Sequence, residues 1–361
     1  MGIYLTLGTI YAFFAILELD DRFTSLSYKL YSFLMIFPMF FLTAFRSINV
    51  GTDTIQYNRI FYLVTNFKEY ASKSYIEPGY IFLNYLGNKI GISYNVFQVL
   101  VTSFIFTSIL LFFRYYSVNI AFSCFLFLML RMMFSVMNIS RSWIATAIVL
   151  YSIKYVKRAQ LKKFVISIVS ATILFHTSAI FALILYPLCH MKLTTKRKSQ
   201  IILLSISIAV IGFPIFKLIV NMLGKYSNFL INVNNETGTA VWISLILHTF
   251  FLFLAKKANL CSSMDNKGEI SIEHIMYVSG FFLVCLDIIG LRINVFNRVT
   301  IHYLPFLTVL VPISIQRIKS ARLAFLMKML ILQILAVYFI IILKFRPEWN
   351  QVIPYSTFWV K

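Results

Sequence analysis

The sequence predicts an all-α protein, a polytopic bundle of transmembrane helices, and two observations carry this prediction. Hydrophobic residues make up 60% of the 361 residues and charged residues only 12%, whereas a soluble domain carries about 25% charged residues. Ten apolar runs also reach, or nearly reach, the about 17–25 residues that cross a bilayer. A soluble fold would leave much of this apolar surface in contact with water.

Each apolar run is predicted to form one membrane helix, and no internal repeat divides them into related halves. The runs are residues 3–19, 30–45, 96–113, 120–137, 143–156, 201–223, 240–255, 274–291, 299–315 and 323–343. With the hairpin described below, we expect about 10–12 membrane segments in one integral membrane domain, residues 1–361.

Lysine and arginine predict which face each loop occupies, because cytoplasmic loops are enriched in them. The basic clusters all fall on one side if the N-terminus begins outside. They are Arg22 with Lys29, Arg114, residues 154–163, 192–198, Lys256 with Lys257, and 317–328. The outer side then receives three loops, 46–95, 224–239 and 292–298, and the first of them contains a short interfacial helix within 78–91.

Residues 164–191 have basic clusters at both ends, so the charge rule requires this run to enter and leave on the same face. The run has 28 residues, too few for two spans of about 20 residues each. We therefore predict a re-entrant helical hairpin with His176 near its tip. The alternative is one long tilted span, which would reverse the orientation of everything before or after it.

The net charge of +21, from 33 Lys and Arg against 12 Asp and Glu, would suggest a nucleic-acid partner in a soluble protein. Here the basic residues form short clusters between apolar runs, without a basic tail or an RNA-binding motif. No nucleic-acid partner is therefore predicted. The excess is larger than orientation requires, which fits contact with membrane lipids or phosphate-bearing substrates.

Four arginines lie on the predicted outer side, where the charge rule does not require them: Arg46, Arg141, Arg292 and Arg298. Convergence on one cavity would let them bind a pyrophosphate, because guanidinium groups form strong paired hydrogen bonds with phosphate. The alternative is that they anchor loops by reaching lipid headgroups.

Few titratable groups are available for proton transfer. Asp53 and Glu77 share the first outer loop with Arg46, Asp287 lies in a predicted span, and His176 is a titratable group inside an apolar run. The alternative for His176 is a buried, hydrogen-bonded structural histidine. The sequence has no acidic pair, His–Cys spacing or phosphate-binding loop that would predict a metal site or a cofactor.

Five patches, in order along the chain, carry a resemblance to a known family. They are Arg46 and Asp53 within 44–57, Glu77 and Tyr80 within 77–84, Arg141 within 141–145, Phe-His-x-Ser-Ala at 175–179, and Arg298 and Tyr303 within 297–303. Together they resemble the EpsG family, the Wzy-like polymerases of bacterial O-antigen, capsule and exopolysaccharide. Ser142 departs from the family, which usually has Gln at that position.

The resemblance implies a multi-pass enzyme of the bacterial inner membrane with its active site facing the periplasm. Such an enzyme joins oligosaccharide repeat units carried on undecaprenyl pyrophosphate, and its implied partners include a flippase and a chain-length regulator. A growing glycan passes from one lipid carrier to the non-reducing-end sugar of a newly arrived unit. No metal or cofactor is expected.

The resemblance and the charges suggest a role for each site residue. Arg46, Arg141, Arg292 and Arg298 would hold the pyrophosphate and neutralise the charge that develops on the leaving group. Either Asp53 or His176 would deprotonate the attacking hydroxyl. Sugar and lipid contacts would come from Glu77, Tyr80 and Tyr303.

Two other functions are compatible with this composition. A flippase or other transporter of lipid-linked sugars would carry similar charges, but is expected to show two related halves. An O-antigen ligase is expected to have its largest outer loop late in the chain, where the loops here are short.

Overall fold

The computed structural model describes residues 1–18, 24–223, 239–260 and 269–359, so nearly all of the predicted loop 224–239 lies outside it. Over the described residues the regular structure is helical, and the β structure is one isolated bridge between Arg46 and Thr357. The prediction of an all-α polytopic bundle is confirmed. The α-helices are α1 (Gly2–Leu17), α2 (Ser25–Ala44), α3 (Thr54–Leu63), α4 (Phe67–Lys73), α5 (Pro78–Lys89), α6 (Tyr94–Tyr116), α7 (Ile120–Met129), α8 (Met132–Asn138), α9 (Ser140–Lys157), α10 (Leu161–Leu174), α11 (Leu185–His190), α12 (Thr195–Leu223), α14 (Thr239–Lys257), α15 (Ile272–Gly290), α16 (Leu304–Gln316) and α17 (Ala321–Phe345).

Four short 3₁₀ helices complete the described regular structure: η2 (Thr177–Ile184), η3 (Asn294–Arg298), η4 (Thr300–His302) and η5 (Pro347–Trp349). Side-chain caps mark where several helices begin. Ser93, Asn119 and Ser271 each accept a backbone N–H from the first turn of α6, α7 and α15, which satisfies a donor that the helix itself leaves unpaired.

Five described helices are long and apolar enough to cross a membrane: α2, α6, α12, α15 and α17. Two bent pairs raise the number to seven if each counts as one span. One is α7 with α8, bent by 59° beside Arg131, and the other is Val295–His302 with α16, bent by 51°. The predicted 10–12 segments also included shorter apolar helices, such as α1 with 16 residues.

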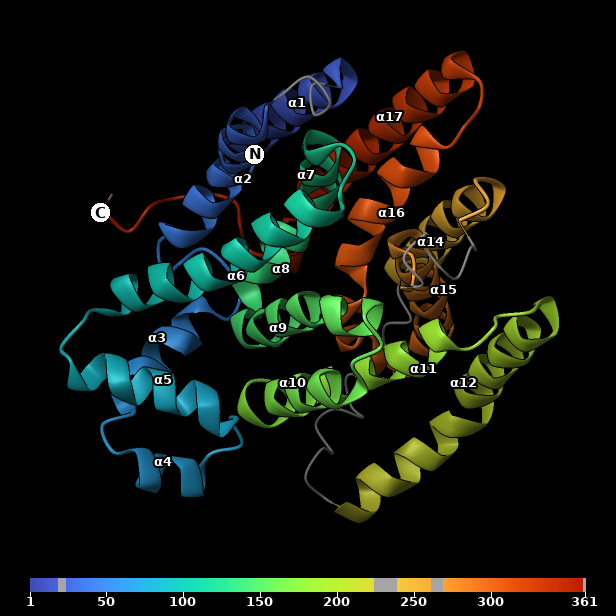
Figure 1. Ribbon diagram of the computed structural model, residues 1–361. Helices are drawn as coiled ribbons and strands as arrows, with labels where there is room; N and C mark the ends of the chain where they lie inside the picture. The colour runs from blue at the N-terminus through green and yellow to red at the C-terminus, as the bar shows by residue number, and fades with distance from the viewer. Residues whose placement is uncertain (19–23, 224–238, 261–268, 360–361) are drawn as a thin grey trace.

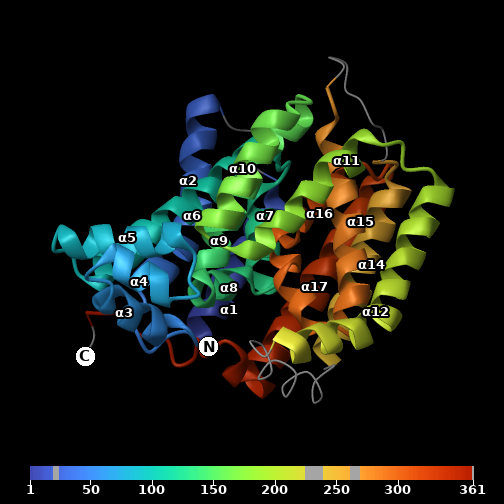
Figure 2. The same cartoon turned by 90° about the horizontal axis from the view of Figure 1, so that it is seen from below.

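The helices are arranged with the loop 46–95, which the charge rule predicts to be the first outer loop, at one side of the bundle and the late helices at the other (Figures 1 and 2). The loop 46–95 contains α3, α4 and α5, and α5 fills most of the range 78–91 in which a short helix is predicted. Both views place α9 and α10 between this group and α12, α14 and α15. Contacts of α9 with α6, α10, η2 and η4 make it the central support of the site described below.

Helix α10 and the residues that follow it form a helical hairpin. The chain reverses at Phe175 and His176, and the second arm consists of η2 and α11. The rings of Phe164, near the start of the first arm, and Tyr186, in the second, lie 5.7 Å apart. The two arms are therefore side by side, and His176 occupies the reversal.

The C-terminal segment lies against the stretch between α2 and α3. Ser47 donates its backbone N–H to the carbonyl of Ser356 at 2.8 Å, and Gly51 donates to that of Gln351 at 2.8 Å. These bonds, with the Arg46–Thr357 bridge, fix the polar stretch that leads into the first outer loop.

Candidate functional site

An ion pair between Glu77 and Arg141 forms the centre of the candidate site. Glu77 is the N-cap residue of α5, and Arg141 lies in the first turn of α9. Nη1 of Arg141 is 2.5 Å from Oε2 of Glu77, and the two side chains are 26% and 10% exposed. The pair is thus open to a ligand on the arginine side, while the carboxylate is largely enclosed.

The tip of the hairpin meets the other oxygen of the same carboxylate. Thr177 donates its backbone N–H to Oε1 of Glu77 at 3.4 Å, and Nδ1 of His176 lies 3.7 Å from that oxygen. Ser178 donates its backbone N–H to Nδ1 of His176 at 3.4 Å. Glu77 therefore joins α9 to the hairpin and sets the position of His176 relative to Arg141.

Burial lowers the pKa of His176, which lies outside the seven candidate spans, below its usual value of 6.5. Glu77 opposes this shift, and Arg141 and Arg298 add to it. The imidazole is therefore neutral near pH 7. Since Nδ1 accepts a backbone N–H, the ring proton is on Nε2, which makes the histidine a hydrogen-bond donor at that atom.

The lowered pKa of His176 predicts a stability change with pH. As the pH falls through 6.5, the unfolded chain takes up this proton before the folded protein does, so the free energy of unfolding falls. We expect the thermal midpoint of the wild type to drop more between about pH 7.5 and about pH 5 than that of His176→Gln. Equal drops for the two proteins would contradict the lowered pKa.

A second histidine is linked to the hairpin by a chain of hydrogen bonds. The hydroxyl of Thr146 donates to the carbonyl of Ser142 at 2.9 Å, so its oxygen accepts the proton of His302 Nδ1 at 2.8 Å. Nε2 of His302 is then an acceptor for the hydroxyl of Ser178 at 2.8 Å. His302 is fully buried, and its bond to Ser178 was not predicted from the sequence.

Two buried tyrosines cover the inner side of Arg141. Its guanidinium lies 6.0 Å from the ring centre of Tyr80 and is close enough to the hydroxyl of Tyr57 to interact with it electrostatically. The two rings are in edge contact at 5.7 Å. Burial raises the pKa of Tyr57, while Arg141 lowers it. Tyr80 was predicted as a site residue, whereas Tyr57 was recognised only within the family patch.

Arg46 lies behind these tyrosines and is only 1% exposed. Its Nη1 donates to the carbonyl of Thr43 at 2.5 Å and its Nη2 to the carbonyl of Met137 at 2.8 Å. The guanidinium therefore joins the end of α2 to the end of α8. Tyr57 and Tyr80 are close enough to influence its charge, and through them it supports Arg141.

Asp53 lies at the start of α3, where its side chain is half-buried and caps no backbone N–H. The hydroxyl of Thr52 donates to its carboxylate at 3.0 Å. Asn138, at the end of α8, accepts the backbone N–H of Thr52. Asp53 is close enough to Tyr57 to influence its pKa, which places the carboxylate at the border of the cluster.

The late patch contributes one arginine to the cluster. Arg298 influences the charge of His176, whereas Arg292 is exposed and shares no described hydrogen bond or ion pair with the cluster. Tyr303 is buried, and its hydroxyl donates to the carbonyl of Phe181 at 2.8 Å in the second arm of the hairpin. Of the four predicted arginines, Arg141 and Arg298 are thus close enough to His176 to influence its charge. Arg46 is buried between the ends of α2 and α8, and Arg292 is exposed.

An apolar cavity of about 330 Å³ borders the charged cluster. Phe175, the neighbour of His176, forms part of its wall, and the remaining wall comes from α5, α6, the Gly91 turn region and Ile144 of α9. Its lining residues are all apolar. A charged group and an apolar chain carried by one ligand could therefore be bound side by side.

The family assignment follows from comparison with known proteins. The model of the EpsG family matches residues 29–357, nearly the whole chain, and includes all five patches. The chain belongs to the EpsG family. Neither the comparison with curated proteins nor that with solved structures gave a match. Membership indicates a membrane protein of polysaccharide polymerisation with glycosyltransferase-like activity.

Gly79 is essential for the close packing of this EpsG-family site. A Cβ at Gly79 would lie 2.5 Å from the carbonyl oxygen of Leu174 and 2.6 Å from its Cβ, so α5 touches the end of α10 directly. We expect Gly79→Ala to separate Glu77 from the hairpin and to lower the free energy of unfolding by about 1–3 kcal/mol.

Thermal unfolding of the purified protein in detergent would measure this effect, with Gly2→Ala as control, because a Cβ there meets nothing within 4 Å. An unchanged midpoint for Gly79→Ala would show that the two elements can separate freely.

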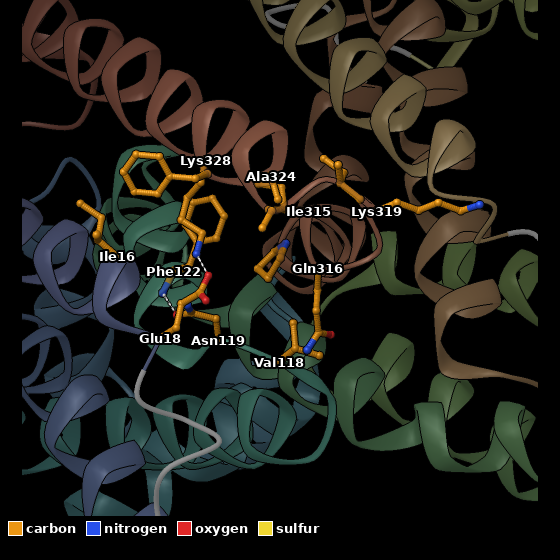
Figure 3. A pocket seen from close by; sticks show the side chains of 14 residues that line it. Ile16, Glu18, Val118, Asn119, Phe122, Ile315, Gln316, Lys319, Ala324 and Lys328 are labelled. Atoms are coloured by element: carbon orange, nitrogen blue, oxygen red, sulfur yellow. Dashed lines mark hydrogen bonds and ion pairs between the residues drawn. The ribbon is translucent and has the colours of Figure 1, made fainter.

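A further cavity, of about 340 Å³, lies where α1, α7, α16 and α17 meet (Figure 3). Lys328 forms an ion pair with Glu18 and donates to the carbonyl of Ala15. Asn119 donates to the same carbonyl at 3.0 Å. These polar side chains hold the end of α1 against its neighbours. The cavity therefore has a structural explanation and is not part of the candidate site.

The described ranges contain no group of three or more His, Cys, Asp or Glu side chains that could hold a metal ion. The cations of Arg141 and Arg298 are the groups of this EpsG-family site that fit a phosphate-bearing ligand.

Proposed function

We propose that this protein polymerises oligosaccharide repeat units carried on undecaprenyl pyrophosphate into O-antigen, capsule or exopolysaccharide. The growing glycan is transferred from one lipid carrier to the non-reducing-end sugar of a second lipid-linked unit. The observation that supports this proposal best is the pairing of the Arg141–His176 cluster with an adjoining cavity of apolar lining. A lipid-linked pyrophosphate likewise combines a charged group with an apolar chain.

The residues of the cluster take separate roles in this reaction. Arg141 and Arg298 bind the pyrophosphate of the donor and stabilise the negative charge that develops as it leaves. His176 donates a hydrogen bond from Nε2 to a phosphate oxygen. Part of the isoprenoid chain lies in the apolar cavity beside Phe175, and Tyr80 packs against the arginine that holds the headgroup.

Glu77 orients this site rather than accepting a proton. One of its oxygens is occupied by Arg141 and the other by the backbone of Thr177. Nδ1 of His176 is likewise engaged by Ser178. Among the predicted bases, Asp53 has a carboxylate that accepts a hydrogen bond from the hydroxyl of Thr52.

The orientation of the protein is part of the proposal. Basic clusters at the ends of α9 and at the start of α12 face the cytoplasm, so that the hairpin enters the bacterial inner membrane from that side and its tip reaches the periplasmic site. A flippase would deliver the lipid-linked units to this side. A chain-length regulator would act on the growing polymer there.

The surface polysaccharide of a deletion strain tests the proposed function. On a gel, we expect the long ladder to disappear while a single repeat unit on its acceptor remains, and we expect the wild-type gene to restore the ladder. Loss of even the single repeat would support a flippase or ligase instead. An unchanged profile for every surface polysaccharide of the host would overturn the proposal.

A further inference from the structure

A second polar cavity, of about 240 Å³, lies among α7, α14, α15, α17 and the η3–η4 segment. Its lining includes Arg131, His248 and Asp287 together with Asn297 and Thr300. Ionisable side chains inside helices of a membrane protein are costly and mark functional sites by default. None of these three ionisable residues belongs to the site described above.

His248 and Asp287 form a buried pair within the walls of this cavity. Nδ1 of His248, on α14, is 2.7 Å from Oδ2 of Asp287, on α15, and their side chains are 7% and 4% exposed. The carboxylate fixes the proton on Nδ1, so Nε2 carries a lone pair. Within the described residues, the hydrogen bond of this imidazole is the one between Nδ1 and Asp287, which leaves Nε2 available to a ligand. An oriented imidazole of this kind can accept a proton from a hydroxyl.

Arg131 lies at the break between α7 and α8, in the left-handed conformation with φ 62°. Its guanidinium stacks over the ring of Trp349 at 5.3 Å, and its Nε has no hydrogen-bond partner. No carboxylate in the described part of the chain pairs with it. The cavity therefore combines a base with a cation that is free to bind a polar or anionic ligand.

The η3–η4 segment contributes residues both to this cavity and to the Arg141 site. Asn297 and Thr300 line the cavity, while Arg298 influences His176 and His302 bonds Ser178. A polymerase needs two lipid-linked molecules at once, one donor and one acceptor. The two sites, which share this short segment, provide for both.

We propose, building on the function proposed above, that the Arg131–His248–Asp287 cavity binds the acceptor sugar and that His248 is the general base of the transfer. The acceptor hydroxyl oxygen forms the bond to the anomeric carbon of the donor glycan, and its proton passes to Nε2 of His248. The bond from that carbon to the pyrophosphate oxygen breaks, and undecaprenyl pyrophosphate leaves with the electron pair. Asp287 positions the imidazole, and Arg131 holds the acceptor.

The test is polymerisation of undecaprenyl-pyrophosphate-linked repeat units, extracted from host membranes, by the purified full-length protein in liposomes. His248→Gln should lower kcat by about 10²- to 10⁴-fold, the usual contribution of a general base, with little change in KM. Arg131→Ala should chiefly raise KM. His190→Gln, the same change at an exposed histidine of α11, should keep the wild-type rate.

A pH–rate profile separates a base from a structural residue. The charged and titratable groups that line the cavity around His248 are Arg131, Asp287 and Tyr338. If the imidazole takes the proton of the acceptor hydroxyl, substitution of His248 or Asp287 should change the pH dependence of the rate. Asp287→Asn, which keeps the volume of the side chain, should lower kcat with little change in KM because the imidazole loses the carboxylate that orients it. If His248→Gln does not fold, Asp287→Asn still tests whether His248 acts as the base.

The outcomes distinguish the two proposals. A wild-type protein that forms no polymer from the units of its own host would overturn the proposed function. An active wild type with unchanged kcat and pH profile in the His248 and Asp287 variants would overturn only the acceptor-site inference. A pH profile that moves instead with Asp53→Asn would assign the base to Asp53 and would likewise overturn it.

Discussion

Replacement of Arg141 by alanine is expected to lower the rate of polymer formation by about 10²- to 10³-fold, the usual effect of removing one preorganised group that stabilises developing charge. The guanidinium is 26% exposed and is held by Glu77, Tyr57 and Tyr80. It is therefore both accessible to a phosphate and fixed in direction. The measurement is turnover of lipid-linked repeat units by the purified protein.

Arg141→Lys separates charge from geometry, because lysine keeps the charge but cannot form paired hydrogen bonds with a phosphate. We expect it to retain part of the activity. Arg59→Ala is the matched control, since Arg59 is an exposed arginine of the same loop on α3. Full activity of Arg141→Ala would remove Arg141 from the mechanism.

Glu77 provides a second check on the same site. If Glu77 acts by orienting Arg141, the loss caused by Glu77→Gln should be much smaller in an Arg141→Ala background than in the wild type. Interaction energies measured in such a double-mutant cycle reach about 0.5–3 kcal/mol for residues in contact. Additive losses would show that Glu77 acts independently, for example on a sugar hydroxyl.

The helices could be predicted because their signal is local. Composition and the lengths of apolar runs are sufficient to indicate an all-α membrane bundle. The basic residues at both ends of 164–191 led to the prediction of a re-entrant hairpin, with one long tilted span as the alternative. The bend beside Arg131 was not predicted. Arg131, in the left-handed conformation, interrupts an apolar run. That run contains no glycine or proline that would have indicated a bend.

The site could be predicted only in part because its contacts join residues far apart in the sequence. Glu77 and Arg141 are charged residues in a membrane protein and were identified for that reason. The bond between Ser178 and His302 joins residues 124 positions apart, and no periodicity in the sequence indicates which buried polar residues meet. The pairing of His248 with Asp287 is of the same kind.

Arg46 shows most clearly that charge alone does not tell which residues of a membrane protein form its binding site. The sequence places this arginine at the membrane surface, where a phosphate could reach it. In the structure, the C-terminal segment covers the same stretch through the Arg46–Thr357 bridge and the Ser47–Ser356 bond. No local signal links the two segments, which are joined only when the whole bundle is assembled.

Arg46→Ala is therefore expected to destabilise the protein rather than to affect the chemical step alone. The guanidinium bonds the carbonyls of Thr43 and Met137 in a site that is 1% exposed. Each hydrogen bond to a charged group contributes about 1.5–3 kcal/mol, so the loss of both should lower the free energy of unfolding by about 3–6 kcal/mol. The thermal midpoint in detergent measures this, with the exposed Arg322→Ala as control.

The same variant separates the two roles of Arg46 that the sequence and the structure favour. If Arg46 binds pyrophosphate directly, Arg46→Ala keeps the wild-type midpoint and loses turnover. If Arg46 supports Tyr57 and Tyr80 from behind, the midpoint falls together with turnover, and Arg46→Lys recovers part of both because lysine can still donate to one of the two carbonyls. The burial of Arg46 and its bonds to backbone carbonyls favour the second result.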